Sequence, residues 1–397
     1  MDSSDLRLVQ LLRSDWEPHV PVPAMSAPDW TDVIRKALHH GVAGLLCRTL
    51  PRLSDADIPS DMLDAAQTFR VRAEAEGAKR VAQTSDVLEA LAAEGIPALP
   101  FKGVALAMLA HADPVVRPSN DIDVLVQREH MARAVACLGA LGYREGETFS
   151  ARIMTACYAT YGQEILFADG RLPVEPHWTF APSPFAIELD LEGMWRRAIA
   201  IDLAGRRTRT LSVEDTLLVA CLHGAKEKWW RLLWVADIAA LVHRHPTLDW
   251  AAVTQRAAQA GMVRILRLGL GLAIALFSTR LPGDLTRAIE RDSATQRLVE
   301  ASKRRLASDA NGPEAIFRVS RYHWDARERI RDRVRYVWRT ITTPHCTHYR
   351  LVTLPDALAF GYVPIKIVHD YLLLPLWRGG KGRLWRRART QVRLEGP

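Results

Sequence analysis

The feature that most constrains this chain is a short alternating segment, Asp121 to Val126, within a sequence whose pattern is otherwise mainly helical. Alternation with period two predicts a strand whose successive side chains point to opposite faces. Asp121 and Asp123 then share one face, and Ile122 and Val124 the other. Two neighbouring carboxylates repel each other unless solvent, a basic partner or a divalent cation compensates them, and Mg²⁺ or Mn²⁺ prefers such oxygen ligands.

The residues before this strand predict a site that can approach an anion. A short apolar run at 96–101 leads into Lys102-Gly103, and a helical segment of small residues follows at 104–112. A glycine turn at a helix N-terminus lets backbone N–H groups approach a phosphate, and a lysine beside it adds positive charge. Arg117, four residues before Asp121, could contact a triphosphate or form a surface salt bridge.

The residues after the pair predict a hairpin. Residues 163–167 and 172–178 flank Asp169-Gly170, a two-residue turn signal. Pro173 and Pro176 favour an edge strand, or a strand that bends.

This hairpin can bring a third carboxylate, that of Glu175, next to the aspartate pair. Three acids could hold one or two metal ions that neutralise charge on a transferring phosphoryl group. His177 alternates in phase with Glu175, so it either faces the same site or is a buried, hydrogen-bonded structural histidine.

The remaining sequence reads mainly as helix: residues 1–95, 128–141, and from Pro184 to about 305, with Leu211-Ser212 opening one segment. We therefore predict an α+β fold, in which a small mixed β-sheet core is embedded in a mainly helical protein. The predicted regions are an N-terminal helical region (1–94), the α/β core (95–182), a helical domain (183–310) and a helical region rich in Arg and Trp (311–397).

The segment from residue 223 to 241 carries several residues at helical spacing. Three- and four-residue steps place these side chains near one helical stripe: His223, Glu227, Trp230, Trp234, Asp237 and Leu241. Core packing explains such a stripe. Alternatively, His223, Lys226 and Arg231 line a nucleotide or acceptor cleft.

Four sequence pieces together resemble an uncharacterised nucleotidyltransferase family related to the polymerase-beta superfamily. They are FKG, RPSNDIDVLV, VEPHW and LHGAKEKWWRLLWVADIAAL, and the resemblance covers roughly residues 95–245. It implies Asp121 and Asp123 as metal ligands, Glu175 as the third carboxylate, and Lys102-Gly103 as the phosphate turn. The wider superfamily has Gly-Ser or Gly-Gly at this turn and often Asp as the third acid, so Glu175 is either a ligand or a base for the incoming hydroxyl.

The resemblance implies transfer of a nucleoside monophosphate from a nucleoside triphosphate, with Mg²⁺ or Mn²⁺ as cofactor and pyrophosphate as product. The acceptor is left open between a small molecule and a peptide or protein, and some family members are associated with clusters that make ribosomal peptides. Two alternatives are a catalytically silent nucleotide-binding or protein-interaction module, and an enzyme that adds nucleotides to RNA ends.

Composition narrows the class of protein. The 397 residues are 48% hydrophobic and 25% charged, and 23 Gly and 22 Pro occur without a repeat period, which excludes collagen-like and long low-complexity chains. A net charge of +8 favours anionic partners without choosing among nucleotides, nucleic acid and acidic membranes. Five scattered cysteines and a start without a signal-peptide pattern predict a cytoplasmic protein. The longest uncharged apolar run has ten residues, Leu268 to Phe277, against about 20 for a membrane span.

Four further signals do not change this interpretation. His345 to His348 lacks a second ligand pair at zinc spacing, and His369-Asp370 fits a helix-face pair. Mixed charges at 321–339 favour a salt-bridged helix face, so nucleic acid is a possible partner but not the favoured one. The basic stretch 378–389, with Trp377 and Trp385, fits a membrane surface or, preferably, a solvated tail.

Overall fold

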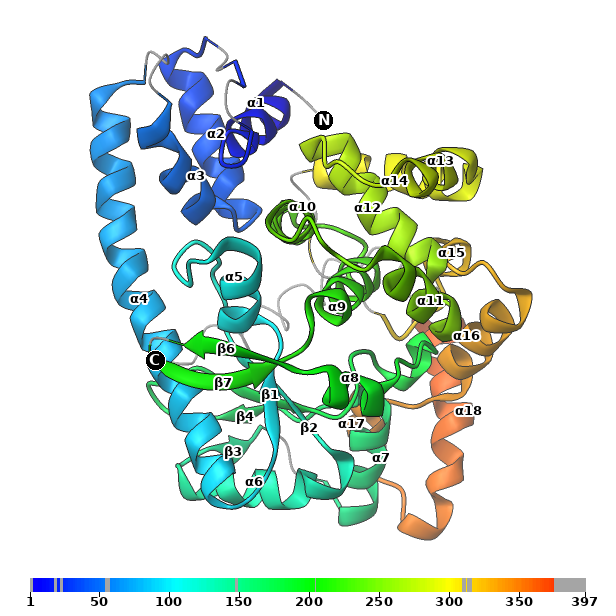
Figure 1. Ribbon diagram of the computed structural model, residues 1–397. Coiled ribbons are helices and arrows are strands. Elements are labelled where there is room, and N and C mark those ends of the chain that lie inside the picture. Colours follow the sequence, from blue (N-terminus) through cyan, green and yellow to red (C-terminus); the bar gives the residue numbers. More distant parts are fainter. Residues whose placement is uncertain are drawn as a thin grey trace.

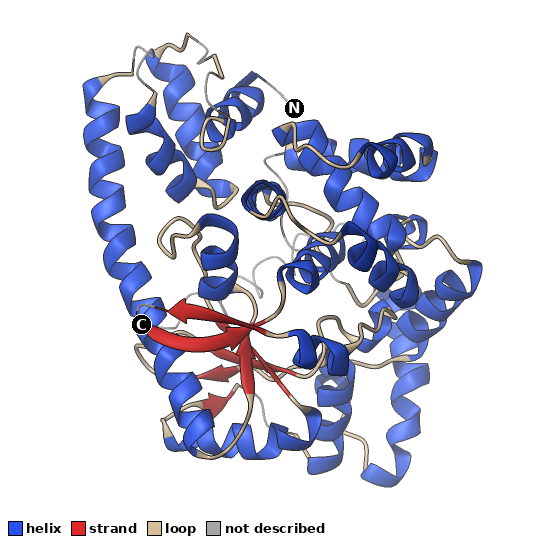
Figure 2. Cartoon of the chain, viewed as in Figure 1, coloured by secondary structure: helices blue, strands red, loops and turns tan. Residues whose placement is uncertain are grey.

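A small sheet at one end of the molecule is surrounded by helices (Figure 2). The computed structural model describes residues 3–17, 20–21, 24–53, 58–146, 149–203, 205–308, 312 and 316–374. The predicted α+β class is confirmed, with a five-stranded mixed sheet in a chain that is mainly helical.

The sheet combines parallel and antiparallel pairs. Its strands run in the order β1 (Ala98–Pro100), β2 (Ile122–Val126), β5 (Val174–His177), β4 (Leu166–Phe167) and β3 (Arg144–Glu145). β2 and β5 are parallel, and the other neighbours are antiparallel. The predicted strand after residue 121 and the predicted hairpin are therefore both present.

The two faces of β2 have different environments, as the alternation predicts. Ile122 and Val124 pack into a hydrophobic cluster that includes Leu138 of α6 (Met131–Ala140). On β2, Asp123 pairs in register with Glu175 of β5. Burial of the apolar face thus fixes which face carries the carboxylates.

The predicted edge position of β5 is wrong, because β5 lies between β2 and β4. The β4 ladder pairs only Leu166 with Val174. Pro176 lies beyond that pair, so its missing N–H leaves no gap in the β4 ladder.

The N-terminal region is helical, as predicted. It consists of α1 (Ser3–Arg13), α2 (Ala27–His39), α3 (Ala43–Thr49) and the long α4 (Ser60–Ala93). Helix α4 runs from the other N-terminal helices to the sheet (Figure 1). Gly95, with a φ of +65°, follows the end of α4 and turns the chain toward β1.

Most of the remaining chain is helical. Its helices are α5 (Gly103–His111), α7 (Ala151–Tyr161), α8 (Leu191–Arg197), α9 (Val213–Lys226), α10 (Leu232–Arg244), α11 (Trp250–Ala260), α12 (Val263–Phe277), α13 (Gly283–Arg291), α14 (Ser293–Leu306), α15 (Arg321–Asp325), α16 (Ile330–Thr342), α17 (Cys346–Leu351) and α18 (Tyr362–Ile367). Short helical turns are η1 (Leu50–Arg52), η2 (Arg128–His130), η3 (Ser183–Phe185), η4 (Asp356–Gly361) and η5 (Val368–Leu373). One hydrophobic cluster joins the N-terminal helices to α9 through α14.

The segment after Pro184 is not wholly helical. A two-stranded hairpin, β6 (Ile199–Leu203) and β7 (Arg206–Thr210), interrupts it, and Gly205 at φ +86° forms part of its turn. Thr210 Oγ1 donates a hydrogen bond to the Pro100 carbonyl, which holds this hairpin against β1. The alternation of Ile199, Ile201 and Leu203 is a strand signal that the helical prediction missed.

The predicted continuous stripe from residue 223 to 241 is also wrong. Helix α9 ends at Lys226, α10 begins at Leu232, and Lys228 and Trp229 between them both have a φ of +55°. The Trp229 ring lies against Gly224, where an added Cβ would come within 2.4 Å of the ring. The buried Trp229 ring therefore packs against α9 at the point where the chain turns from α9 into α10.

Candidate active site

The Lys102-Gly103 turn lies against the loop that leads into β2. Lys102 is the N-cap residue of α5, and Gly103 has a φ of +48°. A Cβ on Gly103 would lie 3.2 Å from Ser119 Oγ and 3.7 Å from the Asp121 carbonyl oxygen. The positive φ and this close approach both favour glycine, so the turn has the geometry that the sequence predicts.

Asp123 is the buried centre of the carboxylate cluster. Its Oδ1 lies 2.7 Å from Lys102 Nζ and 2.8 Å from His177 Nε2. Burial alone would raise the pKa of Asp123, but the Lys102 charge and the His177 hydrogen bond outweigh it and lower this pKa. Asp123 is therefore ionised, with both partners on the same oxygen.

Glu175 and His177 extend the cluster along β5. His177 Nε2 lies 3.4 Å from Glu175 Oε2, and Gln163 donates a 2.7 Å hydrogen bond to that same oxygen. Burial lowers the pKa of His177, but its hydrogen bonds to Asp123 and Glu175 more than compensate and raise it. His177 lies beside Glu175 and is also buried and hydrogen-bonded, so its position fits both alternatives that the sequence leaves open. Its Nδ1 is buried without a hydrogen-bond partner among the described residues.

Asp121 lies at the entrance to β2. Ser119 Oγ donates to its Oδ1 at 2.9 Å. Burial raises the pKa of Asp121, and the charges of Asp123 and Glu175 raise it further. The charge of Lys102 and the Ser119 hydrogen bond lower this pKa, but they do not cancel the rise.

The donor set fits a divalent cation. Single ligand atoms of Asp123, Glu175 and His177 lie within 4.8 Å of one another. His177 Nε2 already contacts both acids, so the carboxylates rather than the histidine are the available ligands. Asp121 lies outside this group, and its carboxylate interacts with Asp123 and Glu175 electrostatically. Hard cations such as Mg²⁺ and Mn²⁺ take carboxylate ligands, and an added positive charge would relieve the repulsion at Asp121.

Arg117 is held by a buried ion pair rather than by a surface one. Only 7% of its side chain is exposed, and its Nε donates to Asp237 Oδ2 at 2.9 Å. His111 Nε2 lies 3.0 Å from the other oxygen of Asp237. Burial raises the pKa of Asp237, but Arg117 and His111 outweigh it and lower that pKa. Arg117 therefore has a fixed position, and it lines one small cavity together with Lys102.

His223 lines the same cavity. A cavity of about 10 Å³, enough for about one water, is lined by residues that include Lys102, Arg117 and His223. Burial lowers the pKa of His223 well below its usual value, and the charges of Lys102 and Lys226 lower it further. His223 is therefore neutral, and the cavity is too small for a nucleotide.

Lys226 and Arg231 do not line this cavity, but they interact electrostatically with His223 and Arg117, respectively. Lys226 Nζ is 3.4 Å from Glu227 Oε1, and the Arg231 guanidinium stacks 4.5 Å from the centre of the Trp230 ring. Burial lowers the pKa of Arg231, as does the charge of Arg117. Neither residue has a hydrogen bond to the carboxylate cluster among the described contacts.

Sequence reasoning missed three supporting residues. Ser119 and Gln163 bind the predicted acids, and Asp237 was assigned to a helical stripe rather than to Arg117. The alternation that singles out Glu175 gives no signal for Gln163, because that contact depends on the bridge that pairs Gln163 with His177 of β5.

Comparisons with known proteins give a family match. The model of a family described as uncharacterised nucleotidyltransferase matches residues 26–278. The solved structure of antibiotic-resistance factor ANT(2'')-Ia is similar at 16% identity over 45% of this chain and 89% of that chain, with a TM-score of 0.32. An antigenic nucleotidyltransferase-like protein from Paracoccidioides brasiliensis is similar at 15% identity over 53% and 92%, with a TM-score of 0.34. No curated protein matches the chain.

Proposed function

The chain belongs to the uncharacterised nucleotidyltransferase family, and we propose that it is a metal-dependent nucleotidyltransferase. It would transfer a nucleoside monophosphate from a nucleoside triphosphate to an acceptor and release pyrophosphate. The observation that supports this most is the parallel pairing of β2 and β5, which sets Glu175 beside Asp123 at the Lys102-Gly103 turn.

Asp121, Asp123 and Glu175 would hold Mg²⁺ or Mn²⁺. When bound, the ion would neutralise charge on the oxygens of the transferring phosphoryl group. Lys102 contributes positive charge at the same place, and the N-terminus of α5 at Gly103 offers backbone N–H groups for a phosphate.

In the proposed reaction an acceptor hydroxyl or phosphate oxygen forms a bond to the α-phosphorus, and the bond to pyrophosphate breaks. Catalysis would come mainly from positioning and charge neutralisation. Glu175, whose Oε2 is fixed by Gln163, serves either as a ligand or as the base that takes the hydroxyl proton. Arg117 and His223 would lie beside Lys102 on the nucleotide side of the site, around a cavity that holds about one water rather than the nucleotide itself, and Lys226 and Arg231 would lie at its rim.

The acceptor class we propose is a small molecule or a peptide or protein. RNA is less favoured, because arginines of the C-terminal region pair with acids: Arg321 with Asp325, and Arg335 and Arg339 with Glu188. We also propose a cytoplasmic location, which the five free cysteines support.

One contact favours a second candidate, a nucleotide-binding module without transfer. Lys102 Nζ donates a hydrogen bond to Asp123 Oδ1, an oxygen that a bound cation would use as a ligand. A module in which the ammonium stays there would bind nucleotide or a partner without turnover.

Labelled nucleotides distinguish the two candidates. The native chain and Asp121→Asn/Asp123→Asn are incubated with Mg²⁺ and α-labelled nucleoside triphosphate, with small-molecule and peptide fractions as acceptors. A transferase moves the α-label to an acceptor, releases a γ-label as pyrophosphate, and loses both activities in the variant. Nucleotide binding with no transfer in any fraction would favour the module.

A further inference from the structure

Large apolar side chains exposed to solvent concentrate near the C-terminus of the described chain. Of the 18 such side chains among the described residues, 12 lie between residues 316 and 374. Single exposed apolar residues are ordinary, whereas several on one side of one helix mark a surface that something apolar covers.

The helix formed by α18 and η5 has its polar side turned inward. Tyr362, Lys366 and Asp370, at four-residue steps, are buried, with 1%, 0% and 2% exposed. The opposite side carries apolar residues in solvent: Ile367 at 37%, Val368 at 43%, Leu372 at 57% and Leu373 at 46%. A surface helix of a globular protein shows the reverse arrangement.

The buried polar side is satisfied by a network around Asp370. Lys366 Nζ lies 2.9 Å from Asp370 Oδ2 and donates to the Phe317 carbonyl at 3.1 Å. His348 Nε2 and His369 Nδ1 lie 3.2 and 2.8 Å from Asp370 Oδ1. Burial raises the pKa of Asp370, but His348 and Lys366 outweigh it and lower that pKa. The network therefore holds the helix with its apolar side outward.

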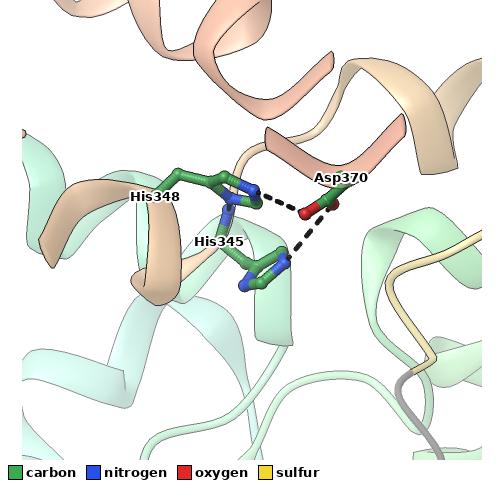
Figure 3. Close-up of side chains that lie close together, drawn as sticks. All are labelled: His345, His348 and Asp370. Carbon is green, nitrogen blue, oxygen red and sulfur yellow. Dashed lines mark hydrogen bonds and ion pairs between the residues drawn. The ribbon is translucent and has the colours of Figure 1, made fainter. Parts of the chain in front are cut away.

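Figure 3 shows His345 and His348 both directed at Asp370. In the sequence these residues belong to two separate motifs, and the fold brings the motifs together. They do not make a good metal site. The His345 backbone N–H donates to His348 Nδ1, which places the ring proton on Nε2, toward Asp370. A metal ligand needs a lone pair at that nitrogen, and Lys366 already compensates the carboxylate.

The sequence that follows the helix is strongly basic. Residues 375–397, which lie outside the described part, carry seven basic residues and one acidic one, a net +6 of the chain's +8, together with Trp377 and Trp385. Apolar residues followed by basic and Trp residues match the anionic lipid surface of a membrane. A second copy of the chain would bring the same positive charge against itself.

We propose that the exposed side of α18 and η5 docks on an anionic membrane surface. Such docking is peripheral. Among the described residues no helix has the length and apolarity to cross a bilayer.

Vesicle flotation of the full chain tests this proposal. The native chain should float with vesicles of phosphatidylcholine plus phosphatidylglycerol, and not with phosphatidylcholine alone, and high salt should weaken the binding. Val368→Gln/Leu372→Gln should lower the partition coefficient about tenfold. Arg386→Gln/Arg387→Gln/Arg389→Gln should lower it about a hundredfold.

The matched control is Leu38→Gln/Val71→Gln, two apolar residues that are 57% and 56% exposed on α2 and α4. It should bind vesicles as the native chain does, and equal thermal unfolding midpoints would show that all variants fold. The proposal is overturned if the native chain ignores anionic vesicles, or if Val368→Gln/Leu372→Gln binds them normally. It is also overturned if light scattering shows a native dimer that this variant converts to a monomer.

Discussion

Replacing Lys102 by methionine removes the lysine charge from the carboxylate cluster while keeping most of the side-chain volume. Lys102 Nζ lies 2.7 Å from Asp123 Oδ1, with 18% and 2% of these side chains exposed. At that separation and an effective dielectric constant of about 20, Coulomb's law gives about 6 kcal/mol of attraction. The His177 hydrogen bond remains, and desolvation of the pair offsets part of this energy. We therefore expect Lys102→Met to lower the free energy of unfolding by about 3 kcal/mol.

Urea denaturation of the native chain and Lys102→Met, each with chelator and with Mg²⁺, measures this effect. Mg²⁺ should stabilise the variant more than the native chain, because the cation compensates the unpaired carboxylates. The matched control is Lys79→Met, whose Nζ lies 2.8 Å from Glu76 on an exposed surface of α4, and which should leave the free energy of unfolding nearly unchanged. If Lys102→Met in chelator is as stable as the native chain, the assigned role of this lysine is wrong.

Three further predictions follow from other buried groups and from the turn. Asp237→Asn leaves the Arg117 guanidinium buried without its counter-ion, so it should lower the free energy of unfolding by about 3 kcal/mol; an unchanged urea midpoint would contradict this. Burial lowers the pKa of His323 and of His345 to about 3, so between about pH 3 and 6.5 the unfolded chain binds more protons than the folded chain. Stability should fall as pH drops below about 6.5, by about 2 kcal/mol per histidine at pH 5, and His323→Gln should flatten this dependence in urea denaturation; a slope identical to the native one would refute the assignment. Gly103→Ala puts a Cβ on a residue with a φ of +48°, so it should lower the free energy of unfolding by about 1 kcal/mol. It should also weaken nucleotide binding measured by calorimetry. Native nucleotide affinity in this variant would show that the turn does not belong to the nucleotide site.

Local patterns predict the part of the fold that carries the site. The alternation around Asp123 predicts β2, the glycine at 103 predicts the turn, and the signals around residue 169 predict the hairpin that carries Glu175. Each depends on residues close in sequence, and the parallel register of β2 and β5 then sets the acids side by side.

Contacts between distant segments explain what the sequence could not predict. The Trp229 ring packs against Gly224 and accompanies the break between α9 and α10. Arg117 reaches Asp237, which is 120 residues away. Spacing along the chain does not indicate which distant residues pair. The sequence therefore could not decide whether Arg117 forms a salt bridge or contacts a triphosphate.

The same reason applies to the C-terminal region. His348 and Asp370 are 22 residues apart, and their contact requires α17 and η5 to pack together. Sequence periodicity does not show which side of a helix faces the protein when both sides carry mixed residues. The outward apolar side of α18 and η5 is therefore visible only in the fold.

Thermal unfolding with a panel of nucleoside triphosphates tests the central claim most directly. The native chain and Asp121→Asn/Asp123→Asn are each measured with Mg²⁺, with Mn²⁺ and with chelator. A triphosphate at about 100 times its dissociation constant should stabilise the native chain by about 2.7 kcal/mol. The account predicts that this gain needs the metal and disappears in the double variant. The absence of any shift, or an equal shift in the variant, would contradict a metal-dependent nucleotide site at this acidic pair.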